Sequence, residues 1–148
     1  MPEIGNDSRP LFGEVKDYAI PMLSGEITIR VRYAETDRMG LLHHANYLVY
    51  FEQGRTELLR SLGLAYRDLE DQGYLLVLTR AEIRYRSPVH YDDLLTLRTM
   101  VVRTTAVRID HRYELLRDGT LVAEGSTTLA CVDRNGRVQA LPETLKER

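Results

Sequence analysis

The chain has 148 residues, of which 43% are hydrophobic and 28% charged, and its formal net charge is −2. This length and balance are typical of one globular domain with a sizeable core. The near-neutral charge argues against a nucleic-acid-binding protein, and no apolar run approaches the length of a membrane span. The single cysteine, Cys131, excludes an intramolecular disulfide and fits a reducing, cytoplasmic setting.

Residues 1–24 contain three prolines and two glycines, and they predict an irregular extension ahead of a single domain over 25–148. The extension has no basic region followed by an apolar run, so we expect no secretory signal. The regular pattern begins at Gly25. Apolar and polar residues then alternate from Ile27 to Tyr33, which is typical of a half-buried strand.

A loop over 35–43 and a helix over 45–62 are predicted next. Tyr47, Phe51 and Leu58 fall on one face of this helix. Gly54 lies in its interior, where glycine costs about 0.5–1 kcal/mol relative to alanine, so we expect close backbone packing there. Gly63 ends the helix, and a shorter helix is predicted over 65–72.

Four strands with short connections are predicted to follow. Their ranges are 74–87, 93–103, 105–117 and 120–132. Asp118-Gly119 is a strong hairpin signal, and Asn135-Gly136 marks a second turn. One strand, a long helix, a short helix and four consecutive strands predict a five-stranded antiparallel sheet with helices on one face, an α+β domain.

The loop before the long helix carries Asp37 and Gly40, and it brings a carboxylate close to the exposed amides of a helix N-terminus. A carboxylate next to amides that hold an oxyanion is an arrangement suited to acyl transfer. Asp37 would serve as nucleophile or general base on a thioester whose carbonyl lies at the amides of His44 and Ala45. Alternatively, Asp37 and Gly40 are ordinary turn residues, and spacing alone leaves both interpretations open.

His43 and His44 are adjacent and therefore point in different directions. Neither HxxxH nor CxxC spacing occurs in the chain, so we predict no metal site and no bound cofactor. The glycine-rich signatures of dinucleotide-binding and P-loop enzymes and the G-x-S-x-G of serine hydrolases are also missing. His44 is interpreted through its backbone N–H, which would polarise the substrate carbonyl.

Two further groups of residues have both a structural and a functional interpretation. Tyr47 is explained at least as well by helix packing as by substrate contact, and Glu52 is either a pocket residue or an ion-pair partner of a nearby arginine. Arg103 and Arg108 flank a predicted turn, where guanidinium groups would suit a nucleotide phosphate. A solvated charged surface is the alternative for both arginines.

The block from Tyr33 to Tyr47, which reads YAETDRMGLLHHANY, resembles the signature of the 4-hydroxybenzoyl-CoA thioesterase-like hotdog family. It is most similar to the acyl-CoA thioesterase branch associated with the Tol–Pal envelope system. Further matching positions follow at 52, 55–57, 85–88, 92–93, 131–133 and 141–142, so the resemblance covers about residues 26–142.

The resemblance implies a hotdog fold, in which an antiparallel sheet wraps round the long helix. It also implies homodimers with sheets joined edge to edge, often paired into homotetramers, and active sites at the dimer interface. Exposed sheet edges favour an oligomer on physical grounds too. The chain departs from the family pattern at residues 104–107, where many relatives carry an arginine and a serine.

Residue by residue, the resemblance assigns the catalytic carboxylate to Asp37 and the amide that holds the carbonyl oxygen to His44. Glu52 falls where the 4-hydroxybenzoyl branch uses an acidic residue to meet the phenol hydroxyl. The expected substrate-binding residues are Gly40, Asn46, Tyr47, Glu52, Arg103 and Arg108.

These features predict a cytoplasmic acyl-CoA thioesterase that releases a free acid and CoA. A hydrolase of acyl-carrier-protein or aryl-CoA thioesters would use the same residues with a different substrate. A non-catalytic acyl-CoA-binding module is the alternative from another class. A hotdog dehydratase fits less well, because its usual His-Asp arrangement differs from an Asp placed seven residues before His44.

Overall fold

The computed structural model describes residues 23–146, so the predicted N-terminal extension lies almost entirely outside the described residues. One antiparallel sheet has the strand order β1-β3-β4-β5-β2. The strands are β1 (Leu23–Arg30), β2 (Leu75–Tyr85), β3 (Leu94–Thr104), β4 (Arg108–Arg117) and β5 (Thr120–Val132). The predicted α+β class with a five-stranded antiparallel sheet is confirmed.

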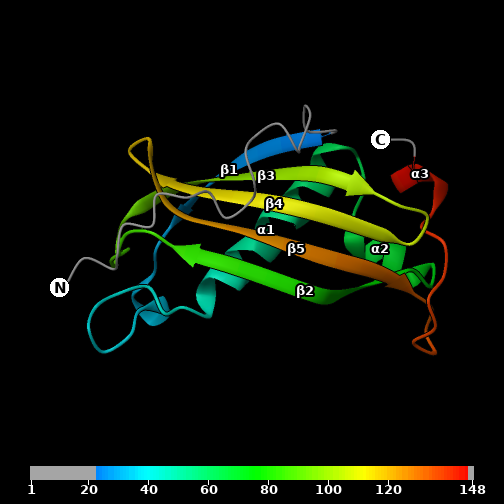
Figure 1. The fold of residues 1–148 in the computed structure, drawn as a ribbon, viewed down its shortest axis with the longest axis horizontal. Helices are drawn as coiled ribbons and strands as arrows, with labels where there is room; N and C mark the ends of the chain where they lie inside the picture. The colour runs from blue at the N-terminus through cyan, green and yellow to red at the C-terminus, as the bar shows by residue number, and fades with distance from the viewer. Residues whose placement is uncertain (1–22, 147–148) are drawn as a thin grey trace.

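The long helix lies along one face of the curved sheet (Figure 1). The helices are α1 (Asn46–Ser61), α2 (Tyr66–Asp71) and α3 (Glu143–Lys146), and a 3-10 helix spans Tyr33–Glu35. α1 begins at the end of the molecule where the loop after β1 projects, and it runs toward the end where α2 and α3 lie (Figure 1). No helix within residues 23–146 has the length and apolar character needed to cross a membrane.

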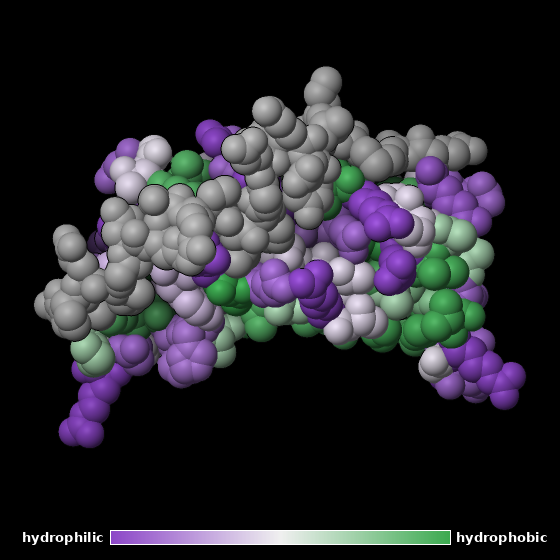
Figure 2. Space-filling view, in the orientation of Figure 1, coloured by the Kyte–Doolittle hydropathy of each residue, from purple (hydrophilic) through white to green (hydrophobic). Residues whose placement is uncertain are grey.

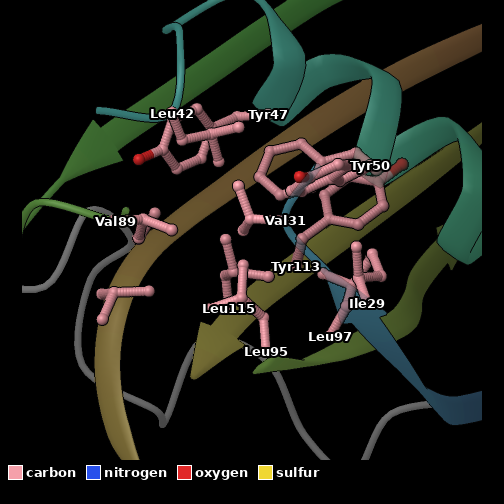
Figure 3. Packing of buried hydrophobic residues seen from close by; sticks show 13 residues of the cluster. Ile29, Val31, Leu42, Tyr47, Tyr50, Val89, Leu95, Leu97, Tyr113 and Leu115 are labelled. Carbon is pink, nitrogen blue, oxygen red and sulfur yellow. The ribbon is translucent and has the colours of Figure 1, made fainter. Parts of the chain in front are cut away.

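The N-terminal half of α1 supplies three buried rings to the main core, those of Tyr47, Tyr50 and Phe51. Phe51 stacks on Tyr113 of β4, with ring centroids 4.2 Å apart and planes 5° apart. Figure 3 shows Tyr47 and Tyr50 on the helix facing side chains from the sheet. Aromatic contacts of this kind bury large areas and fix the rotation of α1 about its own axis.

At Gly54, α1 approaches the sheet closely, as the position of this glycine inside the helix predicts. A Cβ atom placed there would lie 2.7 Å from Leu97 Cδ2 and closer still to Thr99 Oγ1. Both neighbours are buried on β3. The absence of a side chain at residue 54 therefore sets the distance between helix and sheet.

The predicted limits of the first strand were wrong at both ends. β1 starts at Leu23, ahead of the alternation predicted from Ile27 to Tyr33, and ends at Arg30. The pairing stops because the N–H of Val31 donates to Asp93 O (2.9 Å) and that of Arg32 donates to the Glu35 carboxylate (2.8 Å). Tyr33 consequently lies in the 3-10 helix and is 77% exposed.

The remaining boundaries agree within a few residues, with two differences. β4 begins at Arg108 rather than at 105, because Thr105 and Arg108 form a tight turn. Thr105 N–H donates to Arg108 O (2.9 Å), and Arg108 N–H donates to Thr105 Oγ1 (3.0 Å). α3 was not predicted from the sequence. Its Leu145 is buried in a second apolar cluster, beside the C-terminal half of α1.

We predict that Gly54→Ala destabilises the protein by about 1–3 kcal/mol, because the added methyl overpacks the contact with β3. The better helix propensity of alanine, worth about 1 kcal/mol, opposes this only in part. Urea unfolding of wild type and variant measures the change. Gln53→Ala, at an exposed position of the same helix, is the matched control; a Gly54→Ala variant as stable as this control would contradict the packing argument.

Candidate active site

Asp37 organises the projecting loop through its own backbone and carboxylate. Its Oδ1 accepts hydrogen bonds from the N–H of Met39 (2.8 Å) and Leu41 (3.2 Å). The turn closes with Asp37 N–H donating to Leu41 O (2.7 Å), and Gly40 adopts a φ of +77°, which glycine tolerates at no cost. Within residues 23–146, no hydrogen bond uses Asp37 Oδ2, and the side chain is exposed.

The turn interpretation of Asp37 is therefore correct as far as one of its oxygens is concerned. It does not compete with a chemical role, because the second oxygen remains open to solvent. Two backbone amides hold the carboxylate in one orientation. A group held in this way loses little entropy when it meets a substrate.

The start of α1 leaves one backbone amide open next to this loop. Ala45 N–H donates to His43 Nδ1 (3.1 Å), and Asn46 N–H donates to His43 O (2.9 Å). In the described part of the chain, no hydrogen bond uses the N–H of His44, and His44 as a residue is exposed. The expectation that the amides of both His44 and Ala45 are free is therefore corrected, since the His43 ring occupies the second.

Glu35 ties the loop to the helix, and sequence reasoning missed it. Its carboxylate accepts from Arg32 N–H (2.8 Å) and from the Tyr50 hydroxyl (2.9 Å). Its backbone oxygen accepts from His43 N–H (2.9 Å) and from Asn46 Nδ2 (2.8 Å). Only 7% of Glu35 is exposed, so this one residue connects both ends of the loop with the first turns of α1.

The electrostatics of Glu35 follow from these bonds. Burial raises the pKa of its carboxyl, but the hydrogen bonds from Arg32 and Tyr50 lower it by more, so that the pKa lies below its usual value. Burial, followed by the hydrogen bond to Glu35, raises the pKa of Tyr50. Glu35 is thus ionised and Tyr50 neutral at neutral pH.

Tyr85, the last residue of β2, contacts the residues at the start of α1. The Tyr85 hydroxyl donates to His44 O (3.1 Å), and its ring meets that of Tyr47 edge to face at 4.8 Å. Tyr47 is only 4% exposed, and burial, then the nearby Tyr85, raises its pKa to about 12. These contacts fix the peptide group that follows His44, whose N–H belongs to Ala45. Tyr85 lay within the matching blocks of the sequence, but nothing there revealed its contact with His44.

The other predicted site residues have different surroundings. Asn46 and Tyr47 are engaged inside the protein, through Glu35 and the aromatic core respectively. The Glu52 side chain is 72% exposed, and its carboxylate lies 4.0 Å from the Arg55 guanidinium. The ion pair expected as the alternative role of Glu52 is therefore present, although it is long.

Arg103 and Arg108 lie at the β3–β4 connection, and both are exposed. Within one protomer this connection and the loop of Asp37 stand at opposite ends of the sheet (Figure 1). β3 has 11 residues, which correspond to about 33 Å of extended chain. The structure of a single protomer therefore does not bring these arginines to Asp37.

The sequence that contains this loop and helix start matches a known protein family. A model of the thioesterase-like superfamily matches residues 31–148. The chain belongs to the thioesterase-like superfamily. The prediction of a hotdog thioesterase-like protein, and of a thioester hydrolase at the level of the family, is thereby confirmed.

Individual relatives extend the comparison. YneP of Bacillus subtilis (strain 168) is 37% identical over 107 residues, which are 72% of this chain and 78% of that protein. The acyl-CoA thioesterase YbgC of Haemophilus influenzae is 35% identical over 106 residues, 71% and 78% of the two chains. A crystal structure of a DHNA-CoA thioesterase from Staphylococcus aureus has a TM-score of 0.78 and 32% identity, and the match covers 81% of this chain and 82% of that chain.

We predict that Glu35→Gln lowers the free energy of unfolding by about 1–3 kcal/mol at neutral pH, since a buried charge-assisted network loses its anion. Because the folded pKa is lowered, the stabilisation by Glu35 is full above the unfolded value of about 4.3 and is lost as pH falls through the folded value. Denaturant unfolding between neutral and acidic pH should therefore show the two proteins converging toward low pH.

Tyr50→Phe is the matched variant for this prediction, because it removes one donor to Glu35 and keeps the ring. We expect a smaller loss with the same dependence on pH. A Glu35→Gln deficit that stays constant down to acidic pH would contradict the assignment.

Proposed function

We propose that the protein is an acyl-CoA thioesterase that hydrolyses a thioester to a free acid and CoA. The observation that carries the proposal is the combination of a rigid, solvent-open Asp37 carboxylate with the unused His44 amide, joined by one loop that Glu35 anchors. The names of relatives, including an acyl-CoA thioesterase at 35% identity, support the same substrate class.

In this proposal the substrate carbonyl oxygen lies at the His44 N–H, which stabilises the negative charge that develops on it. Asp37 acts in one of two ways. As nucleophile, its Oδ2 bonds to the carbonyl carbon, the C–S bond breaks, the CoA thiolate leaves and takes a proton, and water then hydrolyses the mixed anhydride. As general base, Asp37 removes a proton from the attacking water before the same C–S bond breaks.

We further propose that the active unit is a homodimer, or a pair of dimers, joined through the edge strand β2. Val77 and Leu78 of β2 are 40% and 47% exposed although both are apolar. Figure 2 shows apolar surface along the lower edge of the molecule, where Figure 1 places β2. An exposed apolar edge strand is a ready partner for a second copy. Partner-subunit arginines equivalent to Arg103 or Arg108 would then supply the contact with the CoA phosphates.

The same proposal bears on the cellular location and on the group, CoA or a carrier protein, to which the acyl chain is attached. A CoA ester as substrate fits the predicted cytoplasmic location. A hydroxyaryl-CoA is the second candidate substrate, because the Staphylococcus aureus neighbour at 32% identity is a DHNA-CoA thioesterase. Acyl-carrier-protein thioesters require the same chemistry, so they belong in the assay panel.

We predict that Asp37→Asn lowers turnover by about 10²–10⁴-fold, the range typical of a lost general base. The asparagine Oδ1 can still accept from the amides of Met39 and Leu41, so the turn should persist. Thiol release from short-chain, long-chain and aryl-CoA esters, and from matched carrier-protein thioesters, measures turnover.

Asp68→Asn on the exposed surface of α2 is the matched control and should keep full activity. Unchanged turnover in Asp37→Asn on every substrate would refute the proposed chemistry. Tight retention of CoA esters by the wild type, without release of thiol, would identify a binding module instead.

We predict that Leu78→Arg shifts the protein toward the monomer, because it places a charge on the proposed apolar edge, and that turnover falls with it. Analytical ultracentrifugation and the thiol-release assay follow the two effects. Val138→Arg, at a loop position that is 65% exposed, is the control. An oligomer that survives Leu78→Arg unchanged would exclude β2 as the interface.

A further inference from the structure

A cavity of about 300 Å³ lies between the C-terminal half of α1 and the concave face of the sheet. All five strands contribute side chains to its wall, as do α2 and α3. Most of this wall is apolar, with Leu58, Val101, Ile109 and Leu129 as examples. None of the residues of the Asp37 loop lines it, and its members on α1 begin at Glu52, about 9 Å along the helix from its first residue.

Six polar residues interrupt the apolar wall: Glu52, Arg55, Thr56, Tyr66, Thr104 and His111. Arg55 from α1 and His111 from β4 are the nitrogen-bearing side chains among them. His111 is 6% exposed, and its Nδ1 is buried without a hydrogen-bond partner among the described residues. Buried polar atoms are normally paired, so an unpaired ring nitrogen at the wall of a cavity is unusual. His111 therefore has hydrogen-bonding capacity that no described residue uses.

The positive charge of Arg55, at the wall of the same cavity, has no close anionic partner among the described residues. Only 17% of its side chain is exposed, yet its contacts are long: Nη1 lies 3.4 Å from the Tyr113 hydroxyl and Nη2 lies 4.0 Å from the Glu52 carboxylate. The Tyr113 hydroxyl is itself paired with Thr127 Oγ1 at 2.6 Å. A guanidinium removed from water gains most from a carboxylate that faces it directly.

The charge state of the imidazole fits an anion as well. Burial, and then the neighbouring Arg55 charge, lowers the pKa of His111 to about 3, so the ring is neutral and offers one N–H donor. A neutral donor beside a fixed cation matches a carboxylate, while the apolar wall matches a hydrocarbon body.

We propose that this cavity is a binding site for an amphipathic carboxylate, with the carboxylate on Arg55 and His111 and the apolar chain against the leucine, valine and isoleucine wall. The site is separate from Asp37 within the protomer and does not depend on the proposed hydrolysis. Octanoate is a suitable probe, and octanol has the same chain without the charge.

Calorimetric titration of the full chain tests the site. Octanoate is expected to bind at least about tenfold more tightly than octanol, which is the value of one additional charge-assisted hydrogen bond. Asp37→Asn is expected to bind octanoate as the wild type does, which separates this site from the proposed catalytic one. Equal affinity for the two probes, or binding of neither, would overturn the proposal.

A pair of variants locates the carboxylate. Arg55→Met should remove the preference for octanoate over octanol, whereas Arg60→Met, an exposed arginine of the same helix that pairs with Glu57 at 3.3 Å, should keep it. A preference that survives Arg55→Met would refute the assignment. Imidazole NMR of the wild type requires no variant to fold: the His111 nitrogen resonances should shift with octanoate and not with octanol, and an unchanged spectrum would refute the site.

Discussion

The buried Glu35 carboxylate is the constraint on which the functional end of this molecule depends. It accepts hydrogen bonds from the chain leaving β1 and from the second turn of α1, while its backbone oxygen holds His43 and Asn46. An ionised group at 7% exposure is costly unless its oxygens are paired, so the loop has little freedom to rearrange. By anchoring the loop, Glu35 also restricts the positions of Asp37 and the His44 amide.

Packing of α1 against the sheet provides the second constraint. Aromatic rings fix the N-terminal half of the helix, and Gly54 brings its middle against β3. From Glu52 onward, the helix and the sheet leave between them the cavity that Arg55 and His111 line. The two ends of one helix thus carry different chemistry: an anion and an open amide at its start, and a guanidinium with a neutral imidazole under its C-terminal half.

Local patterns in the sequence anticipated much of this arrangement. Alternation along the strands, the turn signal of Asp118-Gly119 and the interior Gly54 each express a local or nearest-neighbour constraint, and the structure contains the corresponding strands, hairpin and close approach. Asp37 and His44 could be selected because they lie in one short segment before a helix. Glu35 lies in the same segment, but its importance comes from Tyr50 and Arg32, whose contacts no spacing rule specifies.

The amino-acid sequence by itself determined the fold class, the family and the segment in which the chemistry is proposed, because these depend on periodicity and on residues close together in the chain. Only the tertiary structure decided that β1 stops at Arg30, that the His43 ring occupies the Ala45 amide, and that Arg103 and Arg108 stand far from Asp37 in one protomer. It alone also placed Arg55 beside His111. Those outcomes depend on contacts between residues distant in sequence, whose hydrogen bonds and burial are settled only when sheet and helix pack together.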